Sequence, residues 1–131
     1  MEYSPEVVRR FDSTRRAGEL KAGSAGLLSG EAEDRTLGVW VRFQLQVSDG
    51  IVRAARFAAY GCPHTIAAAD YAAERLEGAR ASEIDVVDMG AIRRELGVPV
   101  EKLGKLLRIE DALAACSRAL PRSQNGLFTK D

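Results

Sequence analysis

The sequence has few of the residues that usually carry metal or redox chemistry. Among its 131 residues there are only two cysteines and one histidine. Two cysteines far apart in the chain do not make a disulfide framework, and the sequence shows neither a signal peptide nor an apolar run long enough to span a membrane. We therefore expect a soluble, cytoplasmic protein with reduced thiols.

An excess of charge of either sign is also missing. Nineteen lysines and arginines balance nineteen acidic residues, so the formal net charge is zero. Nucleic acids and anionic membranes usually bind strongly basic surfaces, and we expect neither as a partner. The length suits one domain over residues 1–131, and a domain of that size buries roughly two-thirds of its unfolded surface.

Residues 1–30 are predicted to form a short helix and an extended arm. Ser4, Pro5 and Glu6 are typical of a helix start. The following segment is rich in glycine and small residues, which favours an arm with one edge strand near residues 22–29. The charged residues 31–35 are predicted to be a loop.

Residues 37–60 carry the pattern of a β-hairpin. Apolar and polar side chains alternate strictly from Val39 to Ser48, as in a strand with one buried face. Asp49-Gly50 is typical of a tight hairpin turn, because both central positions of the favoured turn need positive φ. A second strand is predicted to follow and to end near Tyr60.

Residues 62–121 are predicted to be mostly helical, with helices over 63–78, 88–96 and 99–120. The polar residues 122–131 are expected to be a loose tail. Strands early and helices late predict an α+β fold, in which a small antiparallel three-stranded sheet is covered on one face by helices.

Cys62 stands where the second hairpin strand gives way to a helix. A thiol just before a helix meets unpaired N–H groups and the positive end of the dipole, which favours its thiolate. His64 follows two residues later, and a thiol with an imidazole could ligate a metal or form a nucleophile, although stable zinc sites take three or four ligands. The structural alternative makes Cys62 a small half-buried residue and His64 an exposed residue of the first helical turn.

Several motifs occur in one register along nearly the whole chain: Tyr3-Ser4, Arg15 to Gly18, Asp49-Gly50-Ile51, Ala55-Arg56-Phe57, Tyr60-Gly61-Cys62 and Glu110-Asp111-Ala112-Leu113. On these motifs the chain resembles iron-sulfur cluster scaffold proteins of the IscU type, equivalently the N-terminal domain of NifU. The resemblance implies the fold shared by IscU, the NifU N-terminal domain and SufE. It also implies work in iron-sulfur cluster assembly beside a cysteine desulfurase or other assembly proteins.

Members of that family are implied to hold an iron-sulfur cluster, or zinc in its place, with three cysteines, an aspartate and sometimes a histidine. At the aligned positions this sequence has Leu37, Val39, Gly104 and Lys105, and only Cys62 is kept. A cluster needs several thiolates, so we expect cluster or zinc binding to be absent or weak in the monomer. The remaining routes are a homo-oligomer sharing a site built on Cys62, with or without His64, and a role for a single thiol.

Lys105 gives the single-thiol role a physical basis. The resemblance implies that it lies near Cys62, where an ammonium group would lower the pKa of the thiol and prepare it to accept sulfur as a persulfide. The alternative is an exposed lysine on the last helix. Cys116 has apolar neighbours and is predicted to be a buried structural cysteine.

Two further features have both a structural and a functional interpretation. Trp40 is expected to pack under the N-terminal arm, with anchoring of a partner as the alternative. Arg9, Arg10, Arg15 and Arg16 are expected to be a solvated face, with protein docking as the alternative.

Two hypotheses for the whole protein follow. In the first it is an accessory assembly protein that uses Cys62, and in the second it is a regulatory or adaptor module that binds no metal and docks an assembly partner. An independent enzyme is not expected, because a cysteine and a histidine one residue apart at a helix start seldom face each other as nucleophile and base.

Overall fold

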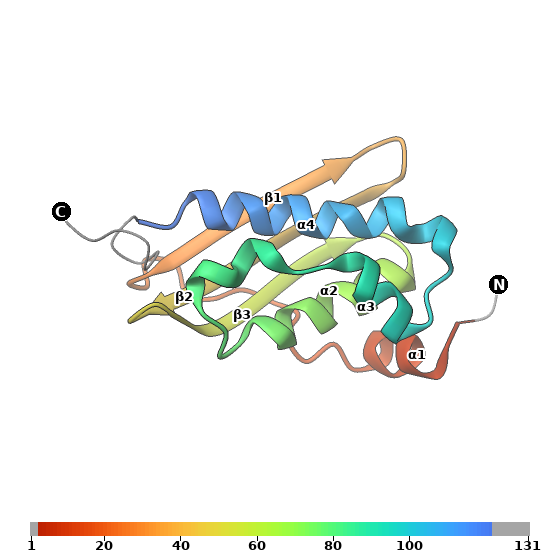
Figure 1. Ribbon diagram of the computed structural model, residues 1–131, viewed down its shortest axis with the longest axis horizontal. Helices are drawn as coiled ribbons and strands as arrows, with labels where there is room; N and C mark the ends of the chain where they lie inside the picture. The colour runs from red at the N-terminus through yellow and green to blue at the C-terminus, as the bar shows by residue number, and fades with distance from the viewer. Residues whose placement is uncertain (1–2, 122–131) are drawn as a thin grey trace.

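The computed structural model describes residues 3–121 and contains one antiparallel sheet with its helices. The sheet has three strands in the order β1 (Leu27–Asp34), β2 (Val39–Ser48) and β3 (Ile51–Tyr60). Helices α2 (Pro63–Leu76), α3 (Met89–Leu96) and α4 (Leu103–Arg118) lie on one face of it, as Figure 1 shows. The predicted α+β architecture is confirmed.

Strand β2 supplies the centre of the core. Its apolar side chains alternate with polar ones, and every second residue from Val39 to Val47 is at most 2% exposed. Burying each of these side chains contributes about 1.5–3 kcal/mol to folding. Helix α4 packs against β1 and β2, and α2 packs against β3, so the inner face of the sheet is fully covered.

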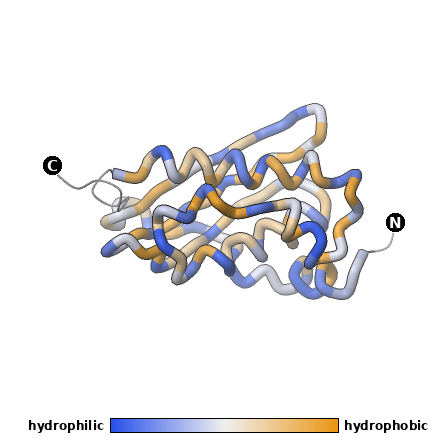
Figure 2. The backbone as a smooth tube through the Cα atoms, viewed as in Figure 1, coloured by the Kyte–Doolittle hydropathy of each residue, from blue (hydrophilic) through white to orange (hydrophobic). Residues whose placement is uncertain are grey.

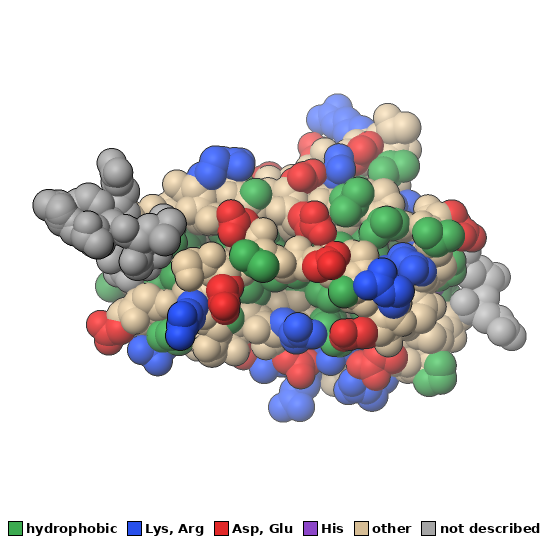
Figure 3. All heavy atoms as spheres, viewed as in Figure 1, with side chains coloured by type: hydrophobic (Ala, Val, Ile, Leu, Met, Phe, Trp, Pro, Cys, Tyr) green, Lys and Arg blue, Asp and Glu red, His purple; other side chains and the backbone are tan. Residues whose placement is uncertain are grey.

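The hairpin turn forms as predicted. Asp49 has φ 55° and Gly50 has φ 73°, the positive values that a tight two-residue turn requires. The pairing of β2 with β3 shifts register between Gln46 and Val47, next to this turn. On the helical face, hydrophobic positions recur between hydrophilic ones along α4, which Figure 2 shows as alternating colours. On the same face, Figure 3 shows acidic and basic side chains interspersed with hydrophobic ones.

Helix boundaries follow local capping chemistry. In α1 (Pro5–Asp12) the Ser4 hydroxyl accepts a hydrogen bond from the Val7 N–H, and in α3 the Asp88 carboxylate caps the first turn. Gly97 ends α3 with φ 72°. The last predicted helix begins as a 3₁₀ turn, η2 (Val100–Lys102), and continues as α4.

One local prediction was wrong. Residues 31–34, expected as a loop, belong to β1, because Glu31 and Glu33 face away from the core and pair across the strand with Arg42 and Trp40. Here pairing with β2 outweighs a polar local sequence. The connection after α2 forms a six-residue 3₁₀ helix, η1 (Ala81–Val86), that buries Ala81 and Ile84.

The N-terminal arm, residues 13–26, runs from α1 along the edge of β3 and across the outer face of the sheet. It bonds to β3 through the backbone of Arg16, Gly18 and Phe57, and then contacts Arg42 and Gln44 of β2. No helix within residues 3–121 has the length and apolar character needed to cross a membrane. The predicted loose tail, residues 122–131, lies outside the described residues.

Candidate functional site

Cys62 occupies the junction between β3 and α2. It is the N-cap of α2, with φ −82° and ψ 167°, and Pro63 follows at the first helical position. Its side chain makes no capping bond to the helix backbone. A Cβ on Gly61 would come within 3.2 Å of the Thr65 side chain, so glycine lets the strand pass close to the first turn.

The surroundings of Cys62 favour the thiolate. The residue is half-buried, and its Sγ lies 3.7 Å from the Thr65 hydroxyl. Burial raises the pKa of the thiol, but the Thr65 backbone N–H and hydroxyl and the His64 N–H at the start of α2, together with the charge of Lys105, leave the pKa below its ordinary value. A thiolate so stabilised is a better nucleophile at neutral pH than an ordinary cysteine.

Lys105 is brought to this junction by the first turn of α4. It is half-buried, and its positive charge acts on both Cys62 and His64. The neighbouring Gly104 is exposed, and a Cβ there would lie 3.7 Å from the Leu37 Cδ1. The fold therefore brings the segment before β2 to the beginning of α4, and the beginning of α4 to the beginning of α2.

The side chains at these positions do not suit an iron-sulfur cluster or zinc. Leu37 is 39% exposed and Val39 is 2% exposed, and both offer only hydrocarbon. Gly104 has no side chain, and an ammonium such as that of Lys105 repels a cation. Within the described residues no group of three or more histidine, cysteine, aspartate or glutamate side chains could hold a metal ion. One chain therefore presents a single sulfur donor here, fewer than a cluster or a zinc ion needs.

His64 is buried, and the expectation of an exposed first-turn residue was wrong. It is 1% exposed and its ring packs against Tyr3, with 4.7 Å between ring centroids. Neither ring nitrogen has a hydrogen-bond partner among residues 3–121. Burial and the charges of Lys102 and Lys105 lower the pKa of His64, so its imidazole is neutral. A ring covered by Tyr3 cannot meet a metal or a substrate unless Tyr3 moves.

Cys116 is structural, as predicted. It is fully buried under β2, and its Sγ lies 3.6 Å from the Phe43 carbonyl oxygen, to which the thiol donates a hydrogen bond. Burial raises the pKa of the Cys116 thiol to about 12. It remains protonated at neutral pH, which leaves Cys62 as the reactive thiol of the chain.

The end of the sheet beside Cys62 carries two aromatic residues. Trp40 and Tyr60 are paired across β2 and β3, and with Glu33 and Arg35 they line a pocket of about 400 Å³. The Trp40 indole N–H donates to Glu31, whereas Tyr60 is 71% exposed. The Arg42 guanidinium lies 5.8 Å from the centre of the Trp40 ring and pairs with Glu19 of the arm. That the arm covers Trp40 stays a prediction.

Comparison with known proteins agrees with this arrangement of strands and helices. Residues 2–125 match the family described as NifU-like N terminal domain. The chain belongs to this family. It is 30% identical over 119 residues to the iron-sulfur cluster assembly scaffold protein IscU of Azotobacter vinelandii, covering 90% of this chain and 93% of that one. It is 29% identical to IscU of Escherichia coli K12, covering 88% and 91% of the two chains.

Solved structures of the family share the fold. The N-terminal part of a nitrogen-fixing NifU-like protein from Brucella abortus superposes with a TM-score of 0.70 at 19% identity, covering 93% of this chain and 92% of that one. A putative scaffold protein for the SUF system from Fervidobacterium islandicum superposes with a TM-score of 0.69 at 14% identity, covering 88% and 96%. At these identities the likeness establishes the fold.

Proposed function

We propose that this protein takes part in iron-sulfur cluster assembly by accepting sulfur on Cys62 as a persulfide. One observation carries the proposal. The fold of a scaffold family is retained, yet among residues 3–121 the one reactive thiol at the junction of β3, α2 and α4 is half-buried Cys62, whose pKa is lowered. Such a site suits transfer of one sulfur atom better than assembly of a cluster.

The transfer is a thiol–persulfide exchange. The Cys62 thiolate attacks the outer sulfur of a cysteine persulfide on the donor protein, a cysteine desulfurase. A new S–S bond forms at Cys62 while the donor's S–S bond breaks, and the donor cysteine leaves as a thiolate with the electron pair. No external oxidant or reductant is needed. Lys105 stabilises the attacking thiolate and afterwards the Cys62 persulfide anion.

A site shared by two copies of the chain would have little to build on. Each copy offers Cys62, but His64 is closed off by Tyr3 and Lys105 adds a positive charge beside the sulfur. Two thiolates alone are fewer than a zinc ion or a cluster takes. We therefore favour sulfur acceptance by the single chain.

Mass spectrometry of the intact protein tests the proposal. After incubation with a cysteine desulfurase and cysteine, we expect Cys62 to gain the mass of one sulfur atom. The adduct should be absent in Cys62→Ser and present in Cys116→Ser. A wild-type protein that gains no sulfur while the desulfurase turns over would refute it.

The second candidate is a module that occupies a partner without chemistry. Exposed apolar groups around Cys62 favour it, since Leu37 is 39% and Tyr60 is 71% exposed. In that case Cys62→Ser would bind the desulfurase as tightly as the wild type and alter its turnover equally. Loss of the effect in Cys62→Ser would exclude this candidate.

A further inference from the structure

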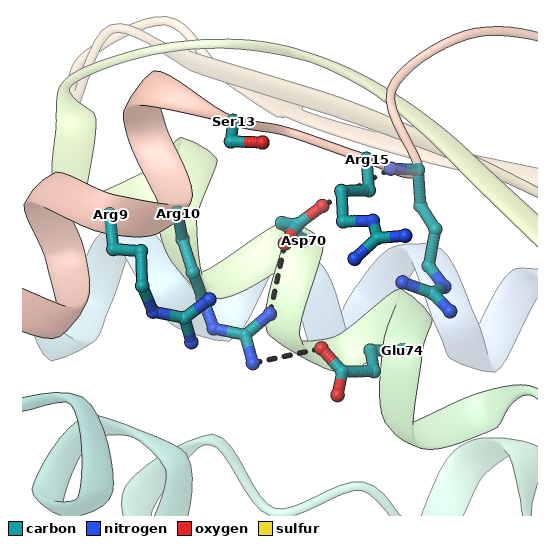
Figure 4. A pocket seen from close by; sticks show the side chains of 7 residues that line it. Arg9, Arg10, Ser13, Arg15, Asp70 and Glu74 are labelled. Atoms are coloured by element: carbon teal, nitrogen blue, oxygen red, sulfur yellow. Dashed lines mark hydrogen bonds and ion pairs between the residues drawn. The ribbon is translucent and has the colours of Figure 1, made fainter.

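A second hollow lies on α1 and α2, and its α2 residues stand at least two helical turns along the helix from Cys62. It has a volume of about 350 Å³ and is lined by Arg9, Arg10, Ser13, Arg15, Arg16, Asp70 and Glu74. As Figure 4 shows, arginines from the end of α1 and the start of the arm meet carboxylates from α2. Sequence reasoning found the arginines but missed Asp70.

The floor of this hollow is a satisfied ion network. Arg10 is 7% exposed, and its guanidinium lies 2.9 Å from Asp70 Oδ2 and 2.8 Å from Glu74 Oε1. The other Asp70 oxygen accepts a hydrogen bond from the Arg16 backbone N–H at 3.3 Å. Both oxygens of the buried carboxylate are therefore occupied, and the network holds the arm against α2.

The rim, in contrast, has unused donors. Arg15 is exposed and makes no ion pair or side-chain hydrogen bond with any residue from 3 to 121, and its side chain reaches toward Asp70 and Glu74 in Figure 4. Arg9 pairs only with Glu6 in that range, and its side chain is 63% exposed. A planar guanidinium has five N–H donors, so these side chains can pair with further carboxylates.

A smaller hollow of about 170 Å³ adjoins the first and is lined by Arg15, Arg16, Arg56 and Glu77. Arg15 and Arg16 line both hollows, and we call the continuous surface the arginine groove. Five guanidinium groups and four carboxylates lie at this groove, so one positive charge is in excess. The groups are Arg9, Arg10, Arg15, Arg16 and Arg56, and Glu6, Asp70, Glu74 and Glu77.

We propose that the arginine groove binds an extended acidic segment of a partner protein. The small excess of charge does not suit nucleic acid, whose binding depends on neutralising many phosphates. Two adjoining hollows suit an extended chain whose alternate side chains point the same way. Arginine pairs with carboxylates through two parallel hydrogen bonds, which gives such a segment both affinity and register. This binding does not depend on the chemistry of Cys62.

Nuclear magnetic resonance of the full-length protein tests the proposal with a synthetic peptide, Gly-Glu-Gly-Glu-Gly-Glu. We expect the peptide to shift the Nε–Hε signals of Arg15 and Arg16 and the backbone signals of residues 13–16. Arg15→Gln should weaken binding about tenfold, the value of one charge-assisted hydrogen-bonded pair. Arg15→Lys should recover only part of the loss, because lysine keeps the charge without the planar fork.

Arg118→Gln is the matched control, since it removes the same charge from an exposed position at the end of α4. It should change the affinity less than about twofold. The proposal is wrong if the groove signals do not move, if a glutamine version of the peptide moves them equally, or if Arg118→Gln weakens binding as much as Arg15→Gln. Displacement of the peptide by an equal concentration of inorganic phosphate would instead indicate a small-anion site.

Discussion

Cys62 is activated by hydrogen-bond donors more than by a charge partner. The Thr65 N–H and hydroxyl and the His64 N–H all lower the pKa of its thiol more than the charge of Lys105 does. These donors belong to the first turn of α2, so the thiolate is stabilised by helix geometry that any folded copy of the chain provides. Lys105 adds a long-range contribution from α4.

This order of effects can be measured by the pH dependence of iodoacetamide alkylation of Cys62. Thr65→Val and Lys105→Gln should each raise the pKa of the thiol, and Thr65→Val should raise it more. Lys21→Gln, which removes an equal charge from the exposed arm, should leave the profile unchanged. Identical profiles for the wild type and Thr65→Val would show that the Thr65 hydroxyl does not activate the thiol.

His64 makes stability depend on pH in a predictable direction. Its pKa in the folded protein is below the ordinary 6.5, because of burial and the charges of Lys102 and Lys105, which Glu101 only partly offsets. Below about pH 6.5 the unfolded chain therefore binds a proton that the folded chain does not, and the free energy of unfolding falls with falling pH.

Urea denaturation at pH 7 and pH 5 of the wild type and His64→Leu checks this prediction. Because both ring nitrogens lack partners within residues 3–121, the leucine variant should stay within about 1 kcal/mol of the wild type at pH 7. It should also lose less stability on acidification. An equal loss in both proteins would mean that carboxylates, and not His64, govern acid stability.

At the level of elements, the sequence predicted what depends on local patterns. The hairpin at Asp49-Gly50 and the end of α3 at Gly97 rest on turn and cap chemistry that neighbouring residues determine. The extension of β1 through Glu31 and Glu33 rests on pairing with β2, so a charged sequence that is typical of a loop became a strand.

Gly30 of β1 shows how closely two elements can approach. A Cβ at this position would lie 2.3 Å from the Ala112 carbonyl oxygen and 2.6 Å from the Cys116 nitrogen, both in the backbone of α4. Gly30→Ala should therefore force the strand and helix apart and reduce the free energy of unfolding by about 3 kcal/mol, the upper end of overpacking costs.

Urea midpoints measure this effect, with Gly104→Ala as the comparison. A Cβ at Gly104 meets only the end of the Leu37 side chain at 3.7 Å, and alanine favours a helix over glycine. That variant should be neutral or about 1 kcal/mol more stable. If Gly30→Ala were as stable as the wild type, β1 and α4 would not be packed as closely as described.

Across the whole molecule, the parts of the site that sequence reasoning could not supply are long-range contacts. Burial of His64 depends on Tyr3, some sixty residues away in the chain. The contacts of Asp70 depend on the packing of α1 and the arm against α2, which no local pattern indicates. The nearness of Lys105 to Cys62 was implied by the family resemblance and by no local pattern. The residues next to Cys62 in the chain predict an activated thiol, whereas the residues around it in space are set by the fold.

The same long-range arrangement predicts that a zinc site can be built at this junction. The Leu37 side chain lies beside Gly104, and the positive charge of Lys105 acts on the Cys62 thiol. Leu37→Cys with Lys105→Cys should therefore place three thiols around one point. Three thiolates and a water molecule complete a tetrahedral zinc site. We expect this double variant to bind one zinc ion per chain by elemental analysis. At a free zinc concentration of about 100 times the Kd, the folded state should gain about 2.7 kcal/mol.

The decisive control is the same double variant carrying Cys62→Ser, which leaves two thiols and should bind zinc weakly and without stabilisation. The wild type, with Cys62 alone at this junction, should carry no stoichiometric zinc. If the double variant folds but binds no better than its Cys62→Ser version, the three positions do not converge. Zinc binding that depends on Cys62 would show that the three positions lie around one point.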